Sequence, residues 1–160
     1  MAKIVTLGVY ETTERRFFDA LVQAKVEVFC DLRLRRGMRG ATYAFVNSNS
    51  LQRRLSDLGI RYMHFLDLAP TQDIRLKQQT SDKNEHILKR ERQVLSPIFI
   101  KLYKEEILAR FQPGAFLNRI QPSQVAALFC VEREPLACHR SLAAQYLAEK
   151  LGIVVEDLKP

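Results

Sequence analysis

The sequence alternates regularly between short apolar runs and segments of helical periodicity. The apolar runs have the length of strands and occupy residues 3–9, 26–33, 60–66, 125–131 and 153–158. Apolar residues three or four positions apart mark the segments between them, so the predicted order is β-α-β-α-β-αα-β-α-β. This order favours a three-layer α/β fold, with a mostly parallel sheet of about five strands and helices on both faces. Both common doubly wound strand orders fit it.

The chain is predicted to form a single α/β domain over residues 1–160. Its length and its hydrophobic content of 47% are sufficient for one sizeable core. Residues of about 67–85 are polar and without clear periodicity, which indicates a solvated excursion. A helical segment is expected over about 85–111, with a second helix beginning at Ser96-Pro97, and residues 116–124 are expected to form a connection.

Composition narrows the class of protein. No apolar run approaches the length of a membrane span and no signal peptide is recognisable, so we expect a cytoplasmic protein that does not contact a membrane. The three cysteines, Cys30, Cys130 and Cys138, suit a reducing compartment better than a disulfide framework. Their spacing matches no zinc pattern, and adjacent Cys138 and His139 at a helix start would point in different directions. We therefore predict no metal site and no cofactor, with Cys30 and Cys130 in the core.

The formal net charge of +7 favours polyanionic partners. Basic residues concentrate in the loop that follows the second predicted strand, where Arg35, Arg36 and Arg39 follow Arg33 closely. We expect these three arginines to contact a nucleic-acid backbone if the ligand is a nucleic acid.

A strand, a polar loop and a helix are predicted over residues 125–151, with Cys138-His139-Arg140-Ser141 where the helix begins. Free backbone N–H groups and the positive dipole end make such a terminus suitable for anions, and Arg140 adds a donor fork. Arg140 and Ser141 are therefore candidate anion-binding residues. The alternative from the same residues is that Arg140 pairs with Glu132 or Glu134 and that Cys138 packs as a small apolar side chain.

Because ligands of parallel α/β proteins bind beyond the carboxyl ends of the strands, the candidate residues should meet at one edge of the sheet. Gly8 follows the first strand, Asp31 and Arg33 follow the second, and Glu132 follows the fourth. Asp31 and Arg33 are two positions apart, so their side chains point to the same side. Gly8 would let backbone or ligand approach closely, or relieve packing.

These residues also carry a family resemblance. Thr6-x-Gly8, Asp31-x-Arg33, Gly59-Ile60-x-Tyr62 and Glu132-x5-Cys138-His139-Arg140 occur in this order across nearly the whole chain. The pattern resembles the family known as domain of unknown function 488, which implies an α/β fold and no settled activity. The resemblance favours a functional role for the site residues Asp31, Arg33, Glu132, Cys138, His139 and Arg140.

Three functions are compatible with these residues, and whether the protein is an enzyme stays open. In the first, Arg33, Arg140, Ser141 and Gly8 bind the phosphate of a nucleotide or nucleic acid, while Asp31 and Glu132 orient the arginines or act as acid and base. In the second, Cys138 beside His139 is the nucleophile of a thiol-dependent enzyme. The third is a non-catalytic interaction domain in which the charged groups form ion pairs.

Overall fold

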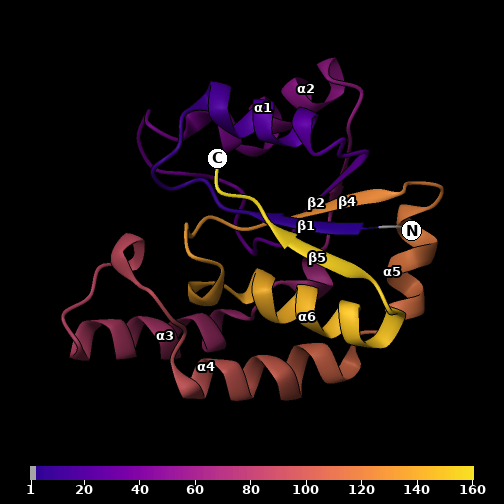
Figure 1. The fold of residues 1–160 in the computed structure, drawn as a ribbon. Helices are drawn as coiled ribbons and strands as arrows, with labels where there is room; N and C mark the ends of the chain where they lie inside the picture. The colour runs from indigo at the N-terminus through magenta and orange to yellow at the C-terminus, as the bar shows by residue number, and fades with distance from the viewer. Residues whose placement is uncertain (1–2) are drawn as a thin grey trace.

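The computed structural model describes residues 3–160 and contains one sheet of five parallel strands (Figure 1). The strands are β1 (Lys3–Leu7), β2 (Val28–Asp31), β3 (Arg61–His64), β4 (Val125–Phe129) and β5 (Val154–Asp157). The predicted α/β class and parallel sheet are confirmed. Each strand is shorter than its apolar run, so Arg33 and Cys130 lie just beyond a strand end.

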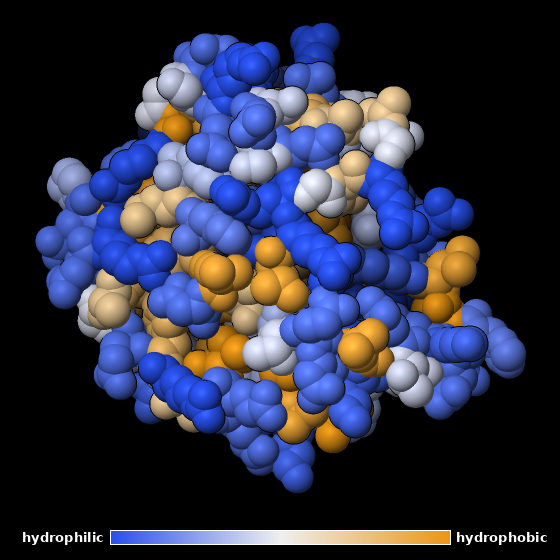
Figure 2. All heavy atoms as spheres, turned by 180° about the vertical axis from the view of Figure 1, so that it is seen from behind, coloured by the Kyte–Doolittle hydropathy of each residue, from blue (hydrophilic) through white to orange (hydrophobic). Residues whose placement is uncertain are grey.

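Helices cover both faces of the sheet. On one face lie α1 (Glu14–Gln23) and α2 (Ser48–Asp57), and on the other lie α3 (Gln72–Asn84), α4 (Pro97–Leu102), α5 (Pro113–Ile120) and α6 (His139–Leu151) (Figure 1). Each face has its own hydrophobic core, one around Phe17, Phe29 and Phe129 and the other around Phe65, Phe99 and Leu128. The side of the molecule seen in Figure 2 is mostly hydrophilic, with hydrophobic side chains in small scattered groups.

Local capping explains where several helices begin and end. The Thr13 hydroxyl accepts a hydrogen bond from the Arg16 N–H at the start of α1, and Ser96 caps α4 ahead of Pro97 as predicted. Gly152 ends α6 with a φ of 66°, a left-handed conformation that favours glycine.

The prediction for residues 67–95 was wrong. The supposed polar excursion contains α3, whereas residues 85–96 are not helical apart from a 3₁₀ turn at Lys89–Glu91. Helix α3 lacks apolar periodicity because two of its three buried residues are polar, Gln78 and Asp82. Leu88 and Val94, which lie in this non-helical segment, are exposed.

The helical segment after Pro97 extends past α4 through a π turn at Tyr103–Ile107 and a 3₁₀ turn at Leu108–Arg110. The expected connection at residues 116–124 is largely α5, which begins at Pro113 with a proline in its first turn. Among residues 3–160, no helix is both long enough and apolar enough to span a membrane.

The strand order is β3-β2-β4-β1-β5, so neither of the two common doubly wound orders applies. Strand β4 lies between β2 and β1 and pairs with both in parallel. The loop that follows β4 therefore emerges at the centre of the sheet, between the loops that follow β1 and β2. This position brings residues 130–140 beside Arg33 on one side and Gly8 on the other.

Candidate functional site

A pocket of about 340 Å³ lies beyond the carboxyl ends of β2 and β4. One wall is the loop after β2, a second wall is α3 together with residues 89–99, and the loop after β4 with the start of α6 forms the floor. The lining residues are Arg33, Leu34, Arg35, Gly37, Met38, Arg39, Pro70, Arg75, Gln78, Gln79, Asp82, Lys89, Arg92, Leu95, Phe99, Cys130, Val131, Glu132, Cys138 and His139. Six of the predicted site residues are among them, namely Arg33, Arg35, Arg39, Glu132, Cys138 and His139.

Arg33 is held on the pocket wall by Asp31. Its Nε and Nη2 donate to the two carboxylate oxygens of Asp31 at 2.9 and 2.8 Å, and Nη2 also donates to the Val46 carbonyl at 2.8 Å. The guanidinium lies 4.9 Å from the ring centroid of Phe129. Asp31 is fully buried and accepts a further hydrogen bond from the Tyr62 hydroxyl at 2.8 Å, so its carboxylate positions Arg33 and does not face the pocket.

One donor of this buried pair is unused. Within residues 3–160, Nη1 of Arg33 is the single buried side-chain nitrogen or oxygen without a hydrogen-bond partner, and Arg33 is only 4% exposed. A buried donor without an acceptor costs about 1–3 kcal/mol. Because Arg33 lines the pocket, an acceptor atom from a ligand would relieve this cost.

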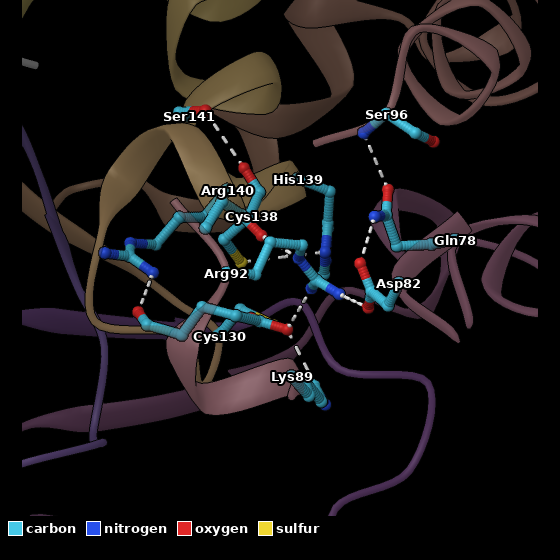
Figure 3. Close-up of polar contacts among 12 residues, drawn as sticks. Gln78, Asp82, Lys89, Arg92, Ser96, Cys130, Cys138, His139, Arg140 and Ser141 are labelled. Atoms are coloured by element: carbon cyan, nitrogen blue, oxygen red, sulfur yellow. Dashed lines mark hydrogen bonds and ion pairs between the residues drawn. The ribbon is translucent and has the colours of Figure 1, made fainter. Parts of the chain in front are cut away.

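Arg92 joins α3 to the pocket floor, and the sequence did not indicate it. Its guanidinium donates to Asp82 at 2.6 Å (Figure 3). It also donates to Glu132 at 2.9 Å and to the Ala137 carbonyl at 3.2 Å. Gln78 supports Asp82 with a 2.7 Å hydrogen bond. The one available signal was the pair of polar side chains at positions 78 and 82, four residues apart, which a helix places on one face.

Two cysteines and a histidine meet on the pocket floor. Sγ of Cys138 lies 3.8 Å from Nδ1 of His139, and the ligand atoms of Cys130, Cys138 and His139 all lie within 4.8 Å of one another. His139 Nε2 is 2.9 Å from the Leu32 carbonyl, and Sγ of Cys130 donates to Glu132 at 3.4 Å. Our premise that Cys138 and His139 point in different directions was wrong, because their Sγ and Nδ1 atoms approach each other to 3.8 Å.

The three groups shift one another's pKa values. Burial alone would raise the pKa of the Cys138 thiol, but a hydrogen bond from Cys130 and the nearby charges of His139 and Arg140 hold it well below its usual range. Burial alone would lower the pKa of His139, and the Cys138 thiolate outweighs this and raises it. Burial also raises the pKa of Cys130 well above its ordinary value.

Arg140, Ser141 and Gly8 do not line the pocket. Arg140 is fully buried, and its guanidinium donates to the carbonyls of Glu132 and Arg133 and to the Thr6 hydroxyl, so it has no exposed donor for an anion. It pairs with the backbone of Glu132 and not with its carboxylate, so the alternative ion pair is absent as well.

The other two residues are also engaged within the protein. The Ser141 hydroxyl donates to the Cys138 carbonyl at 2.9 Å. A Cβ on Gly8 would lie 1.9 Å from the Glu132 carbonyl oxygen, so this glycine allows close approach of backbone and not of ligand.

The arginines of the loop after β2 lie in two different environments. Arg35 and Arg39 are exposed and line the pocket, whereas Nη1 of Arg36 turns to the Tyr62 hydroxyl at 3.3 Å. Of the three arginines predicted to contact nucleic acid, two therefore lie where a ligand in the pocket would meet them.

The parallel sheet and the pocket at its carboxyl edge define this chain as an α/β protein with a strand-end site. The chain belongs to the family described as "Domain of unknown function DUF488", whose model matches residues 13–147. The resemblance noted in the sequence is thus confirmed. No curated protein and no solved structure shows significant similarity to this chain.

Proposed function

We propose that this protein binds a phosphate-bearing ligand, a nucleotide or a terminal nucleotide of a nucleic acid, in the pocket between the β2 loop and α3. The observation that carries the proposal is the charge of the lining. Six cationic side chains face two carboxylates there; the cations are Arg33, Arg35, Arg39, Arg75, Lys89 and Arg92, and the acids are Asp82 and Glu132.

The two carboxylates do not neutralise all six cationic side chains of the pocket lining. Both pair with Arg92 deep in the pocket, and Glu132 has a longer contact with Lys89 at 3.6 Å. Arg35 and Arg39 form no ion pair within residues 3–160, which leaves a net positive field at the mouth. The unpartnered Nη1 of Arg33 adds a directed donor further in.

The size of the pocket favours a small ligand. A volume of about 340 Å³ is at the lower end of the range of small-molecule sites, which is roughly 300–1,000 Å³. A nucleoside phosphate fits this description better than a duplex does. A longer nucleic-acid strand would place its terminal nucleotide in the pocket, while its phosphate backbone contacts Arg35 and Arg39.

Calorimetric titration of the protein with pyrophosphate, ADP and a short 5′-phosphorylated oligonucleotide tests the proposal. A double variant, Arg35→Ala with Arg39→Ala, removes two exposed cations from the mouth. Each such cation contributes up to about 1 kcal/mol, so we expect affinity to fall roughly 10- to 30-fold. Binding should also weaken as salt increases.

The matched control is the double variant Arg110→Ala with Lys150→Ala, which removes the same charge from exposed positions elsewhere. Lys150 lies in the last turn of α6, roughly 16 Å along the helix from His139. The control should bind like the parent. If both double variants lose affinity equally, the loss results from the lower net charge of the protein and not from the position of Arg35 and Arg39. A parent that binds none of the three ligands at low salt would refute the proposal.

A further inference from the structure

Three soft metal ligands from two elements converge on the pocket floor. Cys130 follows β4, and Cys138 and His139 begin α6 (Figure 3). Their ligand atoms lie within 4.8 Å of one another, all three residues are buried, and all three line the pocket. The phosphate proposal uses none of them.

The hydrogen bond of His139 prepares its other nitrogen for a metal. The Leu32 carbonyl, 2.9 Å from Nε2, can only accept, so Nε2 carries the proton. In the neutral ring Nδ1 is then unprotonated and carries a lone pair. This nitrogen lies 3.8 Å from Sγ of Cys138. A second-shell carbonyl that fixes the tautomer in this manner is the usual partner of a metal-ligating histidine.

The spacing of the ligands is close to what a tetrahedral ion requires. With Zn–S near 2.3 Å and Zn–N near 2.0 Å, tetrahedral angles put sulfur and nitrogen about 3.5 Å apart and two sulfurs about 3.8 Å apart. The observed Sγ–Nδ1 distance of 3.8 Å needs a shift of a few tenths of an ångström. The other separations in the cluster, all within 4.8 Å, would have to shorten by up to about 1.3 Å.

We propose that Cys130, Cys138 and His139 bind a divalent metal ion of the zinc class, with the fourth coordination position open to the pocket. Two thiolates and an imidazole disfavour magnesium and calcium, which prefer oxygen ligands. The two thiolate charges cancel that of the dication, so the buried complex is neutral overall. Three protein ligands with one free position is the pattern of catalytic zinc sites.

The metal accounts for the whole cluster, whereas the alternatives account for part of it. A thiolate–imidazolium pair needs Cys138 and His139 and leaves Cys130 without a role. A disulfide between the two cysteines leaves the orientation of His139 unexplained. If the proposed phosphate binding also holds, the open position would receive a ligand oxygen or a water molecule beside the Glu132 carboxylate.

Cobalt(II) titration of the chelator-treated protein, under a reductant that does not bind metal and without any phosphate, tests the site. We expect one cobalt ion per chain, thiolate-to-cobalt charge-transfer absorption, and the visible bands of a tetrahedral ion that zinc then displaces. The affinity of Cys130→Ser should fall at least about 100-fold, since loss of an outer-shell partner alone costs 10- to 100-fold. The control is Cys30→Ser, which makes the same change at a buried cysteine of β2 outside the cluster, and it should bind cobalt like the parent.

Each variant is first checked for cooperative thermal unfolding, and Cys138→Ser takes the place of Cys130→Ser if the latter does not fold. Zinc should raise the Tm of the parent and of Cys30→Ser, but not that of the cluster variant. Absence of charge-transfer absorption in the parent, or equal affinity in the parent and the cluster variant, would overturn the proposal. Because no anion is present, this result is independent of the phosphate titration.

Discussion

Replacing Gly8 by alanine tests how the pocket floor is held in place. Gly8 follows β1, and a Cβ at this position would lie 1.9 Å from the carbonyl oxygen of Glu132 and 2.7 Å from its carbonyl carbon. Both atoms belong to backbone, so no side-chain rotation relieves the overlap. To reach even a tight contact of 3.0 Å, the β1 loop and the β4 loop must separate by about 1.1 Å.

The magnitude follows from what that separation disturbs. The N–H groups of Val9 and Tyr10 both donate to the Val131 carbonyl, at 3.0 and 3.1 Å, and a shift of this size breaks or weakens both hydrogen bonds. Each contributes about 1 kcal/mol, and overpacking in a rigid region costs a further 1–3 kcal/mol. We expect Gly8→Ala to lower the free energy of unfolding by about 3–5 kcal/mol.

Urea unfolding followed by circular dichroism measures this change, with Gly114→Ala as the control. Apart from its chain neighbours and the backbone of its own helix, no atom lies within 4 Å of a Cβ built on Gly114, an exposed residue in the first turn of α5. Alanine there should therefore be neutral or stabilise by up to about 1 kcal/mol. If Gly8→Ala unfolds at the same urea concentration as the parent, the backbone contact between the two loops does not have the role assigned to it.

For three further substitutions, the structure predicts the direction of the change in stability. Arg140→Met should destabilise by about 2–4 kcal/mol in urea, because a buried carbonyl and a partly buried one lose their donor; unchanged stability would contradict a structural role. Arg92→Leu leaves the carboxylates of Asp82 and Glu132 buried without their shared partner and should cost about 3–5 kcal/mol, which the same assay measures. Burial raises the pKa of Tyr62 from 10.0 to about 12, so its contribution is complete below pH 10 and lost as pH rises toward 12; Tyr62→Phe should flatten this decline in stability, and identical pH profiles would contradict it.

The fold was predictable because local signals and the global arrangement agree. The apolar runs at residues 3–9 and 125–131 contain the strands that form the buried centre of the sheet, and Thr13, Ser96 and Gly152 cap helices where their chemistry indicates. Asp31 and Arg33 were expected on one side of a strand, and they form a bidentate pair.

The part of the site contributed by α3 could not be read from the sequence. Helix α3 buries Gln78 and Asp82 against Arg92, and these polar contacts replace the apolar periodicity by which helices are recognised. Arg92 in turn pairs with Glu132, which is 40 residues away in the sequence. Strand order was equally hidden, because nothing local to β4 indicates that it pairs with both β1 and β2.

The residues of the family pattern divide into those that build the floor of the pocket and those that face it. Thr6 accepts from Arg140, and Gly8 admits the Glu132 backbone, so a motif in β1 fixes the loop that begins the last motif. Arg140 then holds the carbonyls at residues 132 and 133 from the far side. This leaves the side chains of Glu132, Cys138 and His139 free to face the pocket.

The motifs at the two ends of the chain therefore form a single structural unit across neighbouring strands. A substitution at Gly8 or Thr6, neither of which lines the pocket, should change the position of the Cys130, Cys138 and His139 ligands. The cobalt spectrum of Gly8→Ala would register such a change where its secondary structure does not. A spectrum and affinity equal to those of the parent would show that the cluster is positioned without the β1 motif.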